Sequence, residues 1–197
     1  MIAVVYLSSL TIGALLASVG TALPLRPGVI GLLLMVAAAL AARRHWLGMR
    51  LSAPGSPERA LWIGLASLAI VLGHMLASLW QIGPALVLHS AAGHELGIDS
   101  WTLVAGGALA WWIARDPQPR RDERDRAIVA DGLRWSYGSL IVLLQPVVFV
   151  LAFGDQRGMP ALSRPLIAHL LIVAVLLSLG IGHARRLQTY RRDGVLD

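Results

Sequence analysis

Residues 60–82 read ALWIGLASLAIVLGHMLASLWQI and contain no aspartate, glutamate, lysine or arginine. A helix needs about 20 predominantly apolar residues to cross the hydrocarbon core of a bilayer. This stretch therefore predicts a membrane-spanning helix. The rest of the chain agrees, because 56% of all residues are hydrophobic and only 14% are charged. That charged fraction is about half the usual value for a soluble domain.

Similar apolar blocks recur along the chain and predict one all-α domain over residues 1–197, a polytopic transmembrane helix bundle of about six spans. The predicted spans are Ile2–Leu23, Gly28–Ala42, Ala60–Ile82, Gly97–Ala114, Trp135–Phe153 and Pro165–Gly182. The second block is slightly short, although Arg43, Arg44 and Trp46 at its end can reach the membrane interface. A re-entrant second segment, which would leave five spans, is the alternative.

The basic residues predict the orientation. All 17 are arginine. When the connecting segments are assigned alternately to two sides, fourteen arginines fall on one side and only Arg26, Arg157 and Arg164 on the other. Basic residues are retained in the cytoplasm. We therefore expect a multi-pass protein of a bacterial inner membrane with both termini inside. This asymmetry also accounts for the net charge of +6, so no direct nucleic-acid partner is expected.

Small residues at four-residue spacing predict the faces on which the helices pack, because in lipid close backbone approach favours association. Three spans carry such stripes: Ser9, Gly13, Ala17 and Thr21; Gly106, Ala110 and Ala114; and Ala174, Ser178 and Gly182.

Two histidines lie inside predicted spans, and both are candidate ligands. His74 and His169 differ in predicted depth by only about 3 Å at about 1.5 Å per residue. If their helices are neighbours, two facing imidazoles can ligate a haem or a divalent metal. The alternative is that each bonds a backbone carbonyl or lies at a wet boundary. No cofactor is the leading expectation.

A second polar cluster lies in and beside the outer loop 83–96. Its members are His89, His94, Glu95 and Asp99. Together with the two intramembrane histidines they offer donors for a metal facing the outside, but their spacing matches no known metal-ligand motif. An ordinary polar loop surface is the default interpretation. The apolar stretch 84–96 is compatible with a short helix along the membrane surface.

A charged segment precedes the fifth predicted span and is the most distinctive part of the chain. Its residues are Arg121, Asp122, Glu123, Arg124, Asp125 and Arg126. As a helix it places Arg121 beside Asp125 and Asp122 beside Arg126, each pair four residues apart. It serves either as a topological anchor for the span or as a docking surface for a cytoplasmic partner.

The last 75 residues or so resemble a family of small bacterial integral membrane proteins of unassigned function. The resemblance rests on Asp122-Glu-Arg-Asp-Arg126 before a span, on a second span after a short outer loop, and on Tyr190-Arg-Arg192 near the end. It implies a protein of two to four spans, in some members beside a small helix-turn-helix regulator. This chain departs from that pattern by four additional predicted spans.

No nucleophile elbow, phosphate-binding loop or paired acidic motif is present, and cysteine is absent, so we expect no enzyme. The leading hypothesis is a membrane protein of sensory, regulatory or assembly type that acts through a cytoplasmic or membrane partner. A haem- or metal-binding redox protein is the first alternative. A small transporter working as a homo-oligomer is the second.

Overall fold

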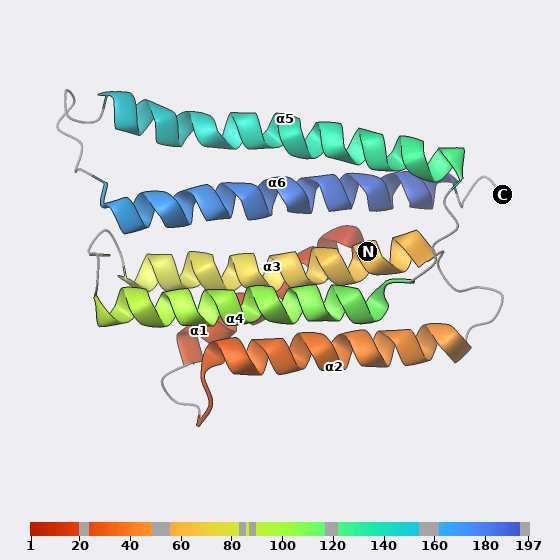
Figure 1. The fold of residues 1–197 in the computed structure, drawn as a ribbon, viewed down its shortest axis with the longest axis horizontal. Coiled ribbons are helices and arrows are strands. Elements are labelled where there is room, and N and C mark those ends of the chain that lie inside the picture. The colour runs from red at the N-terminus through yellow and green to blue at the C-terminus, as the bar shows by residue number, and fades with distance from the viewer. Residues whose placement is uncertain are drawn as a thin grey trace.

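The computed structural model describes residues 1–19, 24–48, 56–82, 86, 90–116, 122–153 and 162–193. Within these ranges the secondary structure is entirely helical (Figure 1). The helices are α1 (Ile2–Val19), α2 (Pro27–Gly48), α3 (Ser56–Ile82), α4 (Ala91–Ala114), α5 (Glu123–Phe153) and α6 (Arg164–Asp193). The predicted all-α class is confirmed.

Most helices extend beyond the apolar blocks that predict them. The helix of the short second block runs on to Gly48 and so includes both arginines and Trp46. The charged segment from Glu123 onward is continuous with α5, and residues 91–96 are the first turns of α4, so neither forms a separate surface helix. Charged and polar residues with good helix propensity carry a helix past the end of its apolar stretch.

Four described helices, α2, α3, α5 and α6, are long and apolar enough to cross a membrane by length and composition. α1 is a shorter apolar helix. α4 has the length but carries His94, Glu95 and Asp99 in its first half, which lowers its hydropathy. The chain therefore has the main structural feature of an integral membrane protein.

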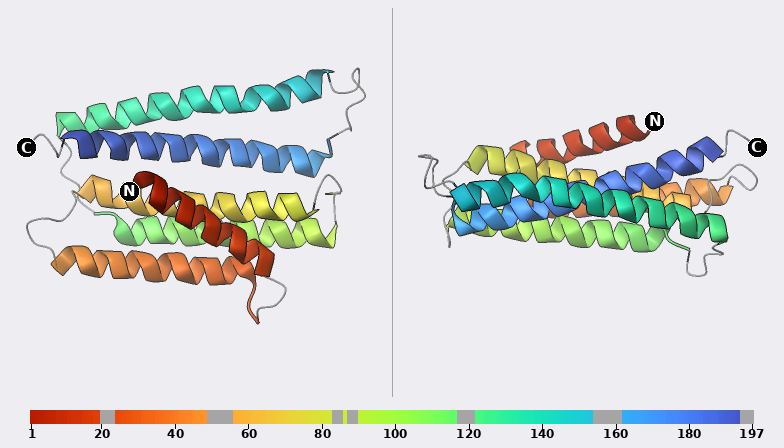
Figure 2. Two further views of the ribbon diagram at one scale, coloured as in Figure 1. Left: turned by 180° about the vertical axis from the view of Figure 1, so that it is seen from behind. Right: turned by 90° about the horizontal axis from the view of Figure 1, so that it is seen from above.

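The helices lie in a broad, shallow bundle in the order α5, α6, α3, α4, α2, and α1 crosses α3 on one face (Figures 1 and 2). α3 is central, since it packs against α1, α4 and α6. In its most apolar window 67% of the residues are buried, whereas in that of α5 the share is 0%. α5 packs mainly on α6, so its outer face presents apolar side chains such as Val142, which is 68% exposed.

The closest helix crossing joins α1 to α3 through two glycines. A Cβ at Gly13 would overlap the Ile70 carbonyl, and a Cβ at Gly73 would overlap the Leu10 carbonyl. This contact confirms Gly13 as a packing position. Ser9 on the same stripe is also buried, and Thr21 lies outside the described residues.

The other two stripes are confirmed in the same way. On α6, Ala174 and Ser178 are buried, and a Cβ at Gly182 would lie 2.9 Å from the Gly132 carbonyl oxygen of α5. On α4, Ala110 is fully buried, and Gly106 faces Leu32 of α2.

The helix order gathers the arginines at one end of the bundle. That end carries the N-terminus, the start of α5 and the end of α6 (Figure 1). Among the described residues only Arg26 and Arg164 lie at the opposite end, where α2 and α6 begin. We call this opposite end the α2-start end.

Candidate functional site

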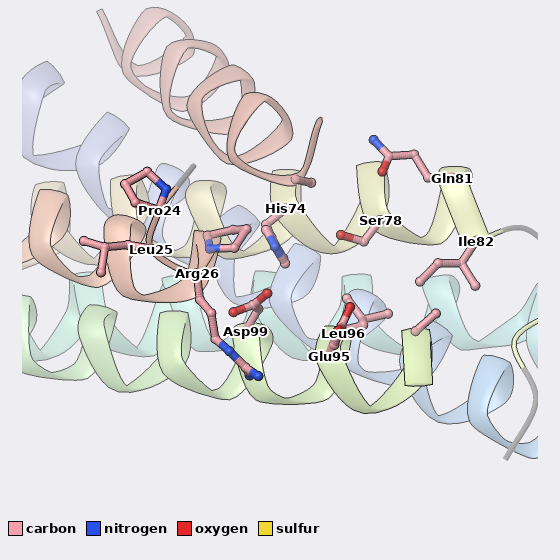
Figure 3. A pocket seen from close by; sticks show the side chains of 13 residues that line it. Pro24, Leu25, Arg26, His74, Ser78, Gln81, Ile82, Glu95, Leu96 and Asp99 are labelled. Carbon is pink, nitrogen blue, oxygen red and sulfur yellow. The ribbon is translucent and has the colours of Figure 1, made fainter. Parts of the chain in front are cut away.

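A polar pocket of about 410 Å³ opens at the α2-start end, between α1, α3, α4 and the segment leading into α2 (Figure 3). Its volume falls within the range of small-molecule sites. Its polar lining residues are Arg26, His74, Ser78, Gln81, Glu95 and Asp99. Three of these, His74, Glu95 and Asp99, are candidates from the sequence that the fold brings together.

His74 is the deepest polar residue of this pocket. It is only 2% exposed, and its Nδ1 is buried without a hydrogen-bond partner among the described residues. The close crossing at Gly13 and Gly73 holds α1 over this part of α3 and thereby encloses the ring. A buried polar atom without a partner costs roughly 1–3 kcal/mol, and the fold carries this cost beside the pocket that the imidazole lines.

Asp99 faces His74 from α4 (Figure 3). Its Oδ1 accepts a hydrogen bond from the Gly28 backbone N–H at 3.2 Å. Gly28 lies in the first turn of α2, where backbone N–H groups lack partners within the helix. A Cβ at Gly28 would come within 2.8 Å of Asp99, so glycine allows this close approach. Asp99 thus fixes the start of α2 with one oxygen and retains a second for the pocket.

Ser78 and Gln81 extend the polar lining along α3. Both are missing from the sequence-based candidates, although a signal was present: residues 74, 78 and 81 are spaced by four and three and so share one helix face. Gln81 Nε2 donates to the Ser18 hydroxyl of α1 at 3.3 Å, which leaves its amide oxygen available as an acceptor. Arg26 joins the pocket from the segment before α2, a placement that spacing along the chain does not reveal.

The remaining histidine candidates do not line the pocket. His169 lies on α6, where its Nδ1 hydrogen-bonds the Pro165 carbonyl oxygen at 2.7 Å. His94 is exposed on α4, and His89 lies outside the described residues. Across the described ranges no three His, Asp or Glu side chains are close enough together to hold a metal ion.

The charged segment at the other end of the molecule is partly engaged within the fold. Asp122 Oδ1 accepts from the Asp125 backbone N–H at 2.7 Å and caps α5. Asp125 in turn accepts from the Tyr190 hydroxyl of α6 at 2.6 Å. A turn and a half further on, Asp131 pairs with Arg185 at 2.7 Å.

The rest of the charged segment faces outward. Glu123, Arg124 and Arg126 are exposed, and Arg121 lies outside the described residues. The segment therefore combines two roles in one turn of helix, since the Asp125 carboxylate joins α5 to α6 while Glu123 and Arg126 are exposed to the surroundings.

The described part of the chain is all-helical, with several membrane-length helices and an open pocket lined by several polar side chains at one end. The chain matches no protein-family model, no curated protein and no solved structure.

Proposed function

We propose that the chain is an inner-membrane protein of six spans with both termini in the cytoplasm, and that it binds a small polar solute in the pocket at the α2-start end. The arginine-rich end is then cytoplasmic, and the pocket opens to the outside. Binding of an external solute suits a sensory or regulatory role.

The observation that carries this proposal is His74, a nearly fully buried imidazole that lines the cavity and has an unpartnered Nδ1. Buried polar groups in proteins are almost always hydrogen-bonded. A histidine that only filled space in a lipid-embedded bundle would be expected to bond a nearby carbonyl, as His169 does with Pro165. His74 instead meets a cavity wall that carries further polar side chains.

The test is ligand-dependent stabilisation of the purified chain in lipid nanodiscs. Small amines, amino acids, sugars and carboxylates are screened by thermal unfolding, followed through tryptophan fluorescence. We expect at least one class to raise the melting temperature of the wild type but not of His74→Phe. His169→Phe is the matched control, because it removes an intramembrane histidine outside the pocket. Equal responses of both variants, or none from the wild type, would contradict the proposal.

Solute binding alone does not distinguish a sensor from a carrier. A carrier also predicts flux of the stabilising solute into proteoliposomes, whereas a sensor binds it without moving it. Flux in the wild type that is lost in His74→Phe would show that the protein is a transporter of this solute.

Capture of a cytoplasmic partner is a second candidate function, supported by the exposure of Glu123 and Arg126 at the arginine-rich end. The informative variant exchanges their charges, Glu123→Arg with Arg126→Glu, because this leaves the Asp122 cap and the Asp125 hydrogen bond in place. We expect loss of a stoichiometric partner that co-purifies with the wild type. Arg44→Glu, an exposed change at the same end, is the control. If the exchange variant still co-purifies with the partner, the proposal that this charged surface captures it is contradicted.

A further inference from the structure

Apart from Arg26, the polar side chains that line the pocket offer mainly hydrogen-bond acceptors. Asp99 and Glu95 contribute carboxylates, and the Gln81 amide has its nitrogen engaged with Ser18 and its oxygen free. The Ser78 hydroxyl can accept as well as donate, and a neutral imidazole such as that of His74 has one acceptor nitrogen. A ligand complementary to this wall must bring several donors.

The charges of the lining residues also favour a ligand that is a hydrogen-bond donor, because their sum is negative. Two carboxylates line the pocket against one guanidinium, that of Arg26. Figure 3 shows this guanidinium beyond Asp99, on the side of Asp99 away from His74 and Ser78. The part of the cavity bounded by His74, Ser78 and Glu95 is therefore on the acidic side, where a positive charge is favoured.

The histidine and carboxylates of the cavity do not form a cluster of three metal ligands among the described residues. No three His, Asp or Glu side chains in the described ranges approach closely enough for a metal ion, yet the cavity measures about 410 Å³. A bare cation would meet too few ligands at once. A polyatomic cation with N–H groups at several positions can meet separated acceptors simultaneously.

We infer that the ligand of this pocket is a compact organic cation of the amine or guanidinium class. The inference rests on the proposed solute-binding function and specifies its ligand. The cationic centre lies against Asp99 and Glu95, and one N–H donates to the imidazole of His74 that lines the cavity. Hydrogen bonds to ionised groups are the stronger ones.

The test compares probes that differ in one property at a time. Methylguanidinium and methylurea have nearly the same shape, but only the first is charged. Tetramethylammonium is charged but has no N–H group. Binding to the full chain in nanodiscs is measured by isothermal calorimetry. We expect methylguanidinium to bind at least about tenfold more tightly than either of the other two, as a charged hydrogen bond implies.

Two variants locate the charge. Asp99→Asn keeps an oxygen for the Gly28 N–H but loses the negative charge, and Glu95→Gln changes an exposed residue with little risk to folding. Each should weaken methylguanidinium binding by about tenfold or more. Glu123→Gln at the arginine-rich end removes the same charge far from the pocket and should leave binding unchanged.

The outcomes separate this inference from the proposed function. If methylurea binds as tightly as methylguanidinium, and His74→Phe abolishes both while Glu95→Gln affects neither, the pocket binds solutes but the cation inference is wrong. If neither these probes nor the solutes of the wider screen bind the wild type, both the inference and the proposed function are overturned.

Discussion

The Tyr190 hydroxyl donates a 2.6 Å hydrogen bond to the carboxylate of Asp125, across a sequence separation of 65 residues. This bond joins the last turns of α6 to the first turn of α5, beyond the apolar block that ends at Gly182. Burial, together with the hydrogen bond to Asp125, raises the pKa of Tyr190 above its ordinary value. The hydroxyl therefore remains a donor throughout the physiological pH range.

Tyr190→Phe should destabilise the packing of α5 on α6 by about 1–2 kcal/mol, because it removes a donor to a charged acceptor. Thermal unfolding in detergent measures the change. Tyr137→Phe is the matched control, since Tyr137 lies on α5 and is 69% exposed. Equal effects of the two substitutions would show that the Tyr190 hydroxyl contributes nothing specific.

Gly73→Ala should destabilise the protein by about 1–3 kcal/mol, the usual cost of overpacking. The added methyl group would overlap the Leu10 carbonyl, and the backbone of α1 cannot yield as a side chain can. Gly138→Ala is the control, because no atom lies within 4 Å of its Cβ position. That variant should be neutral or up to about 1 kcal/mol more stable, since alanine favours a helix. A Gly73→Ala protein as stable as Gly138→Ala would contradict the close crossing.

Asp99→Ala should expose the start of α2, at a cost of about 0.5–2 kcal/mol as for other lost helix caps. Asp99→Asn should retain most of this stability, because its amide oxygen still accepts from the Gly28 N–H. Hydrogen exchange at the Gly28 amide reports the bond directly. We expect fast exchange in the alanine variant and slow exchange in the asparagine variant, and the same rate in both would rule out the cap.

The orientation can be tested by single cysteines, because the chain contains none of its own. His94→Cys and Glu123→Cys change exposed residues at opposite ends of the bundle. A membrane-impermeant maleimide added to intact cells should label His94→Cys alone and should reach Glu123→Cys only after permeabilisation. The reverse labelling pattern would show the opposite orientation in the membrane, with the pocket open to the cytoplasm.

The helices were largely predictable, because the free energy of moving apolar residues into lipid depends on the composition of each block alone. The same reasoning underestimates the length of the helices. Arg43 and Arg44 belong to α2, and the acidic turn at Glu123 belongs to α5. A helix ends where capping and backbone geometry require it to end, which hydropathy does not measure.

The pocket was predictable only in part. His74, Glu95 and Asp99 are prominent because polar groups are rare in apolar blocks, and the polar face formed with Ser78 and Gln81 can be recognised from helical spacing. Their meeting depends on α3 lying beside α4 and on the segment before α2 bringing Arg26 to the pocket. These are contacts between segments distant in sequence, and a hydropathy pattern describes each segment by itself.

The position of α5 at the edge of the bundle bears on how the protein is made. Every residue that lines the pocket lies within α1 to α4 and their connections, whereas α5 packs mainly on α6. During synthesis the whole lining is therefore translated before the final hairpin. A chain truncated after α4 would already carry the complete set of pocket side chains.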